Sequence, residues 1–268
     1  MNHPHRAGFS MLGVLITMVC IIVLFTIGMN AMNKAITGAG SALPGTVRST
    51  QDMMSLNALY QAMIVGGQMM PDSRLPVPNL YAKSNDQSLN TTANFYSSMI
   101  AQQLVNPSGL ISGNEYSPRV EAMRDYNYNS YQPSRGTYWD TRFLADLDDL
   151  SHTSFAHMPL YGERYRRGWQ SNFDSRLILI GNRGPKDGID DPGSYSYGRS
   201  GVWGGHFVYG DGRVAFSSVF VPEGLTYERN NQSYPDNIFF METGAGGMDA
   251  IIAFTKRMTS QGPELQYD

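Results

Sequence analysis

The sequence predicts an α+β protein in which a long N-terminal transmembrane helix leads into a head domain with an antiparallel β-sheet. Positions 7–33 carry no charged residue, and a bilayer span needs about 20 such residues. Apolar residues at helical spacing follow between positions 53 and 63. A Gly-Asp-Gly turn at 210–212 separates two alternating segments, as in a β-hairpin. The 28 Gly, 14 Pro and 16 Tyr among 268 residues favour a loop-rich head over a helical bundle.

The composition excludes several classes of protein. Charged residues make up 16% of the chain, below the roughly 25% of ordinary soluble domains, which excludes a highly charged disordered chain and a coiled coil. The 20 Lys and Arg against 23 Asp and Glu give a net charge of −3, so we expect no nucleic-acid partner. The single cysteine, Cys20, excludes an intrachain disulfide.

The N-terminal segment from Phe9 to Met29 is almost wholly apolar. Secretory signals have apolar regions of about 7–15 residues, so this segment is too long for a typical cleaved signal. Arg6 precedes it, and the positive-inside rule then places the N-terminus in the cytoplasm. We therefore expect a single-pass protein of the inner (cytoplasmic) membrane with a periplasmic or extracellular head domain.

The residues Arg6-Ala7-Gly8-Phe9 resemble the processing site of type IV prepilins and pseudopilins, where a short basic leader ends in Gly before Phe. The resemblance implies that a prepilin peptidase cuts after Gly8 and methylates the new N-terminus at Phe9. It also implies that other pilin-like subunits bind through the N-terminal helix in the membrane. The family usually has Glu at the fifth mature position, where this chain has Gly13.

This resemblance divides the chain into four parts. They are a prepilin leader at 1–8, a transmembrane helix at 9–33, a helical extension at 34–67 that packs on the head, and an α+β head domain at 68–268.

The apolar pattern predicts the elements of the head in order. The helical extension places Met53, Leu56, Tyr60 and Met63 on one buried face. Further along, we expect a buried strand at 177–180, a hairpin formed by 206–209 and 213–216, and final strands at 236–240 and 250–254.

A second resemblance involves the C-terminal half. His206, a Gly-rich loop and the pair Asp211-Gly212 are similar to the end of the H-X9-DG group of bacterial prepilin-like proteins, which are abundant in planctomycetes. The segment Pro235-Asp236-Asn237-Ile238 is similar to a short Asp-Asn-Ile box that often follows in that group. The resemblance implies a membrane-anchored, pilin-like protein. Because Gly201 stands ten positions before Asp211, where that group has its His, no role is carried over to His206.

The chemical motifs of common enzymes are absent from the sequence. There is no Gly-x-Ser-x-Gly elbow, P-loop or His-Glu-x-x-His helix, and the cysteine lies in the membrane segment. His206 and Asp211 are an odd number of positions apart, so a regular strand would place them on opposite faces. We therefore expect no enzyme activity.

A loop at 187–191 offers a candidate metal site. Asp187, Asp190 and Asp191 supply three carboxylates within five positions, and Ca²⁺ prefers several oxygen ligands. The spacing differs from that of the EF-hand, and Asp-Gly-Pro loops also form ordinary turns, so both interpretations stay open. No other cofactor is expected.

These observations favour a structural role. The sequence predicts a minor pilin or pseudopilin subunit of a type IV pilus-like or type II secretion-type filament. A membrane-anchored binding module for a glycan or an envelope component is the first alternative, with the Tyr-rich segment 124–139 as a binding loop. The second alternative is an envelope hydrolase with a carboxylate or calcium site within 187–211.

Overall fold

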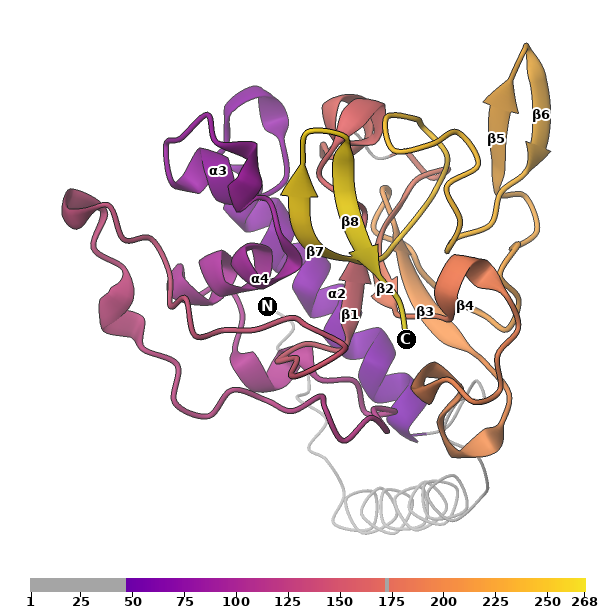
Figure 1. Ribbon diagram of the computed structural model, residues 1–268, viewed down its shortest axis with the longest axis horizontal. Coiled ribbons are helices and arrows are strands. Elements are labelled where there is room, and N and C mark those ends of the chain that lie inside the picture. The colour runs from indigo at the N-terminus through magenta and orange to yellow at the C-terminus, as the bar shows by residue number, and fades with distance from the viewer. Residues whose placement is uncertain (1–46, 172–173) are drawn as a thin grey trace, which may run out of the picture.

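The computed structural model describes residues 47–171 and 174–268, which form a mixture of helices and antiparallel sheets (Figure 1). The predicted α+β class is confirmed for this part of the chain. Among these residues no helix combines the length and the apolar character that a membrane crossing requires. The predicted leader and transmembrane helix, with the processing residues Gly8 and Phe9, lie outside the described residues.

A four-stranded antiparallel sheet forms the centre of the fold. Its strands lie in the order β1 (Phe155–His157), β2 (Ile178–Asn182), β3 (Gly205–Tyr209) and β4 (Val214–Ser217). The predicted buried strand corresponds to β2, and the predicted hairpin around 210–212 corresponds to β3 and β4. Both predictions are confirmed.

The helix α2 (Val47–Gly67) crosses one face of this sheet and contacts β2, β3 and β4 (Figure 1). Three of the residues predicted to face the core, Leu56, Tyr60 and Met63, are buried there. The prediction is wrong for Met53, which is 41% exposed, because the buried side of the helix at that turn belongs to Asp52. A carboxylate at this position needs polar partners, which the loops around the sheet supply.

Two shorter helices complete this layer, α3 (Pro78–Tyr81) and α4 (Thr92–Ala101). The Thr91 hydroxyl caps α4 by accepting a hydrogen bond from the Asn94 N–H. Phe95 of α4 is fully buried and meets the Trp169 ring edge-on, with 5.5 Å between centroids. Burial of such a side chain stabilises the fold by about 1.5–3 kcal/mol.

The strands place alternate side chains in two apolar clusters, one on each face of the sheet. In β3, Val208 faces the cluster under α2 and α4, whereas Phe207 and Tyr209 face the second cluster with Trp203 and Phe239. The sheet is therefore covered on both faces, which explains why β3 is buried along its whole length.

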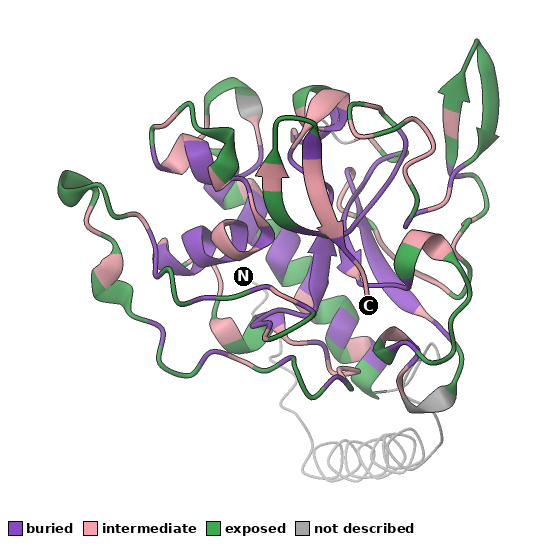
Figure 2. Cartoon of the chain, in the orientation of Figure 1, coloured by how far each residue is buried: buried purple, intermediate pink, exposed green. Residues whose placement is uncertain are grey.

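Two additional hairpins follow the sheet. They are β5 (Thr226–Arg229) with β6 (Gln232–Pro235), and β7 (Phe254–Thr259) with β8 (Gly262–Gln266). Figure 2 shows that β5 and β6 project from the body of the molecule with mostly exposed residues. Asn230 and Asn231 form its turn with positive φ values of 54° and 59°.

The final strands predicted at 236–240 and 250–254 are largely wrong. Residues 238–240 form a turn in which the Phe240 N–H donates to the Asn237 carbonyl at 3.0 Å, so this segment does not pair as a strand. Residues 250–253 make a single bridge, between Ala253 and His157 of β1, and only Phe254 belongs to a strand. The two segments instead contribute Ile238, Phe239, Ala250 and Ile252 to the second cluster.

Candidate functional site

The turn residues Asp211 and Gly212 seat the central hairpin on α2. Gly212 has φ +84°, and a Cβ at this position would lie 2.6 Å from the Tyr60 ring. The Tyr60 hydroxyl donates to the Gly210 carbonyl at 3.1 Å. Asp211 accepts a hydrogen bond from the Arg213 N–H, which closes the turn. These contacts give the Asp-Gly pair a structural position in the described fold.

His206 lies near the start of β3, on the side that faces α2. Its Nε2 is 3.3 Å from the Ser49 hydroxyl, and its backbone N–H donates to the Asn182 side chain. Burial lowers the pKa of His206, and the nearby Asp52 carboxylate only partly offsets this effect. His206 is the second residue of β3, whereas Asp211 lies in the turn that follows this strand. The two side chains contact different residues and do not form a pair.

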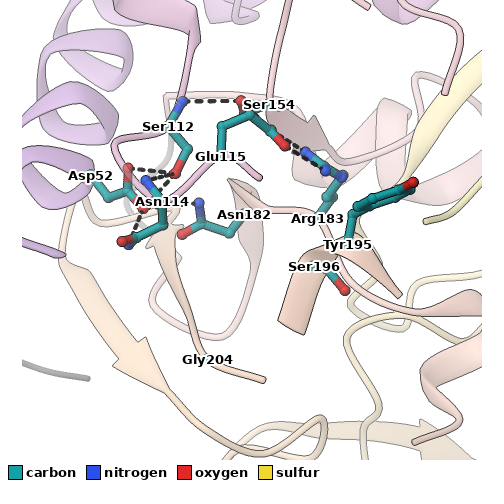
Figure 3. A pocket seen from close by; sticks show the side chains of 10 residues that line it. All are labelled: Asp52, Ser112, Asn114, Glu115, Ser154, Asn182, Arg183, Tyr195, Ser196 and Gly204. Atoms are coloured by element: carbon teal, nitrogen blue, oxygen red, sulfur yellow. Dashed lines mark hydrogen bonds and ion pairs between the residues drawn. The ribbon is translucent and has the colours of Figure 1, made fainter. Parts of the chain in front are cut away.

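A small polar pocket surrounds Asp52 where α2 meets the sheet (Figure 3). The Asp52 carboxylate accepts hydrogen bonds from the Ser112 hydroxyl, the Gly113 N–H and the Asn114 amide at 2.7–3.0 Å, and from the Asn182 amide at 3.3 Å. Burial raises the pKa of Asp52, although these donors counteract the increase. Both oxygens of this buried acid therefore have partners within the protein.

Glu115 lies beside this pocket and pairs with Arg183 (Figure 3). The Glu115 oxygens accept from the Arg183 guanidinium and from the Ser154 hydroxyl, and Arg183 also approaches Asp268 at 3.3 Å. Burial opposes ionisation of Glu115, but Arg183, Ser154 and the Ser117 N–H outweigh it and hold its pKa below the ordinary value. The pocket is thus lined by acids that are already neutralised or hydrogen-bonded.

The three aspartates predicted as a calcium loop point to different partners. Asp190 accepts a hydrogen bond from the Tyr197 hydroxyl, and Asp191 accepts one from the Gly193 N–H at 3.0 Å. Asp187 lies in the left-handed region at φ 55°, within a tight turn. Their oxygens do not gather into a cluster of three or more acidic ligands. In the described residues the loop has the contacts of an ordinary turn.

A different trio of acids is brought together in the chain that follows the β5–β6 hairpin. Within the described ranges, Asp236, Glu242 and Asp249 are the group whose carboxylate oxygens all lie within 4.8 Å of one another. Asp236 and Asp249 are 1% exposed, and Glu242 is half-buried. The motif residue Asp236 thus belongs to a cluster, while its neighbour Asn237 donates its backbone N–H to Glu242 at 2.9 Å.

Arg164 is the cation next to this trio. It begins a five-residue π-helix (Arg164–Gly168) and is fully buried, with its guanidinium paired to Asp249. Its other N–H groups donate to the carbonyls of Gly244, Ala245 and Asp249 at 2.7–3.1 Å. Arg164 therefore holds the 243–249 loop in the position that brings Asp249 toward Asp236.

The trio is electrostatically strained. Burial, together with the Glu242 and Asp249 carboxylates, raises the pKa of Asp236 to about 7. Burial also raises the pKa of Glu242. A cavity of about 510 Å³ opens beside the cluster and is lined by Asp236, Asp249, Thr243 and the base of the β5–β6 hairpin. Solvent and small ligands therefore have space next to the acids.

Sequence reasoning identified only one member of this trio. Glu242 and Asp249 follow Asp236 within 13 positions, but their spacing matches no known ligand motif, so they were missed. Arg164 was missed because it is 85 positions away from Asp249. Comparison with protein-family models, curated proteins and solved structures gave no match.

Proposed function

We propose that the protein is a pilin-like structural subunit, processed after Gly8 and held in the cytoplasmic membrane by its N-terminal helix, with the head domain outside. The observation that carries this proposal is the Arg6-Ala7-Gly8-Phe9 site at the start of the uncharged positions 7–33. In this proposal the subunit assembles through its membrane helix into a type IV pilus-like or type II secretion-type filament.

The exposed face of α2 supports helix packing between subunits. Arg48 and Asp52 are the only charged residues of the helix, and Asp52 is buried, so the outer face beyond the first turns is uncharged. Met54 and Val65 are 64% and 51% exposed on that face. A groove of about 370 Å³ beside Met54 continues this uncharged surface between α2 and residues 104–110. Such a surface suits contact with the helix of a second copy.

Processing is tested on the protein purified from its native membrane. N-terminal sequencing and intact mass should show a chain that starts at N-methylated Phe9. A Gly8→Arg variant provides the control, since a bulky charged residue blocks approach of a peptidase to the backbone. A wild-type chain that still starts at Met1 would contradict the proposal.

The absence of Glu at position 13 favours one alternative, a membrane-anchored binding module that does not assemble. The exposed Tyr128 and Tyr131 at the tip of the 124–139 loop would then contact a glycan or an envelope component. Cys20, the single cysteine, allows the two roles to be separated by oxidative cross-linking in membranes. Single cysteines moved along positions 18–25 in a Cys20→Ser background should cross-link with helical periodicity in an assembled subunit and show no such pattern in a monomeric module.

A further inference from the structure

Each acid of the trio Asp236, Glu242 and Asp249 is held by one oxygen and leaves the other without a partner. Asp236 Oδ2 accepts from the Ala250 N–H at 2.7 Å, and Glu242 Oε1 accepts from the Asn237 N–H. Asp249 Oδ1 accepts from Arg164 and from the Thr243 hydroxyl. The remaining oxygens, Asp236 Oδ1, Glu242 Oε2 and Asp249 Oδ2, are buried and have no hydrogen-bond partner.

The unpartnered oxygens belong to side chains that the fold fixes in place. Asp236 and Asp249 are more than nine-tenths buried, and their bonds to Ala250 and Arg164 orient the carboxylates toward one another. A buried oxygen without a partner is costly, and a bound cation would satisfy several such oxygens of one cluster at once.

The charge of the cluster identifies the kind of ligand. When all three acids are ionised, the three carboxylates and the Arg164 guanidinium carry a surplus of two negative charges in a buried environment. A divalent cation neutralises this surplus, whereas a water molecule does not. The atoms available to coordinate an ion are all carboxylate oxygens, and the group contains no His or Cys. Oxygen ligands of this kind suit Ca²⁺ rather than Zn²⁺ or Cu²⁺.

We propose that Asp236, Glu242 and Asp249 form a calcium-binding site that fastens the 236–253 segment to the body of the head. The neighbouring cavity of about 510 Å³ leaves room for the water ligands that complete a coordination shell of about 6–8 oxygens. In this proposal two groups hold the 243–249 loop. Arg164 binds the carbonyls of Gly244 and Ala245, and the ion binds the Asp249 carboxylate. This site does not depend on filament assembly.

The test uses the full chain in detergent, treated with EGTA and then returned to about 1 mM calcium, a concentration typical of extracellular sites. Metal analysis after dialysis should find a calcium ion bound to each chain. The melting temperature should rise by about 5–10 °C when calcium exceeds its dissociation constant by about 100-fold. Magnesium at the same concentration should have a smaller effect, because it demands a tighter octahedral shell.

Asp236→Asn and Glu242→Gln should abolish both the bound calcium and the rise in melting temperature. Each removes one negative charge from the cluster, so neither should lower the stability of the calcium-free protein. Glu242 is half-buried, so its variant is the safer one for folding. The matched control is the triple variant Asp187→Asn/Asp190→Asn/Asp191→Asn, which removes the loop carboxylates and should bind calcium as the wild type does.

Three results would overturn the proposal. They are no bound calcium in the wild type, a calcium response that survives Asp236→Asn, and loss of the response in the triple control. In the first case the cluster is neutralised by a shared proton, and in the third the calcium site is the 187–191 loop.

Discussion

Two groups of buried carboxylates in the head have different surroundings. Asp52 and Glu115, between α2 and the sheet, have hydrogen-bond partners on every carboxylate oxygen. Asp236, Glu242 and Asp249 each leave one buried oxygen without a partner. The difference separates two uses of a buried acid. The first cluster ties loops to a helix and is complete, whereas the second has capacity for a ligand.

The largest effect is expected from breaking the complete cluster. Arg183→Met leaves Glu115 buried without its cation, and we expect a loss of about 3–5 kcal/mol in the free energy of unfolding. Urea denaturation followed by circular dichroism measures this loss. Arg176→Met is the control, because the Arg176–Asp174 pair is on the surface and should contribute within about 1 kcal/mol. Equal losses for the two variants would mean that burial of the Glu115–Arg183 pair has no energetic consequence.

Asparagine substitutions compare the two clusters directly. In Asp52→Asn the new amide N–H groups face the donors that the carboxylate accepted, so we expect a loss of about 1–3 kcal/mol. In calcium-free protein Asp236→Asn relieves repulsion among three acids and should be neutral or stabilising. Thermal melts in EGTA measure both. A similar loss in both variants would remove the distinction between the clusters.

On acidification, His157 and Glu115 should each lower the free energy of unfolding of the head, in two separate pH ranges. His157 is fully buried, its Nδ1–H donates to the Met158 carbonyl, and its Nε2 accepts from the Thr92 hydroxyl. Burial lowers the pKa of His157 to about 4. The unfolded chain therefore takes up a proton near the ordinary value of about 6.5 while the folded protein does not.

The contribution of His157 to the free energy of unfolding should consequently decrease by up to about 1.4 kcal/mol per pH unit from pH about 6.5 down to about 4. It is measured in an Asp236→Asn background, because the raised pKa of Asp236 acts in the opposite direction over the same range. His157→Asn should flatten this window, although it also lowers the overall stability. The contribution of Glu115 has the opposite origin, because its pKa is depressed in the fold. It is present above its ordinary pKa and is lost as the pH falls through the lower folded value, so Glu115→Gln should change the slope only below about pH 4.5. Denaturation series between pH 3 and 8, about half a unit apart, would show whether the two windows are separate.

The smallest effect concerns the aspartate loop. Asp191→Asn alters an exposed side chain that accepts one backbone hydrogen bond, so stability should stay within about 0.5 kcal/mol of the wild type. A larger loss in the same urea assay would show that this loop, too, carries a structural carboxylate.

Sequence patterns predicted the elements whose residues follow a single period. The β3–β4 hairpin has both alternation and a Gly-Asp-Gly turn, and α2 has apolar residues three and four apart. The β5–β6 hairpin was missed because its exposed strands have no apolar face, although its Asn230-Asn231 turn is a usable signal. The segments at 236–240 and 250–254 resembled strands because they are apolar, but the first turns at 238–240 and the second makes only the Ala253–His157 bridge before β7.

The candidate site was predictable only in part for a related reason. Asp187, Asp190 and Asp191 are dense in the sequence, yet local turns direct them to Tyr197 and to backbone N–H groups. Asp236 and Asp249 are brought together by the path of a loop that Arg164 holds from a distant π-helix. The contacts of Arg164 span 80–85 positions, so no local sequence pattern predicts them.

The projecting β5–β6 hairpin is a suitable site for a tag that locates the protein in cells. Its turn at Asn230 and Asn231 is exposed and lies at the outer end of the projection (Figure 2). Exposed turns of this kind accept inserted peptides with little cost to the fold. A short epitope or a fluorophore-binding tag placed between the two asparagines would therefore report where the head is displayed, and whether antibodies reach it on intact cells.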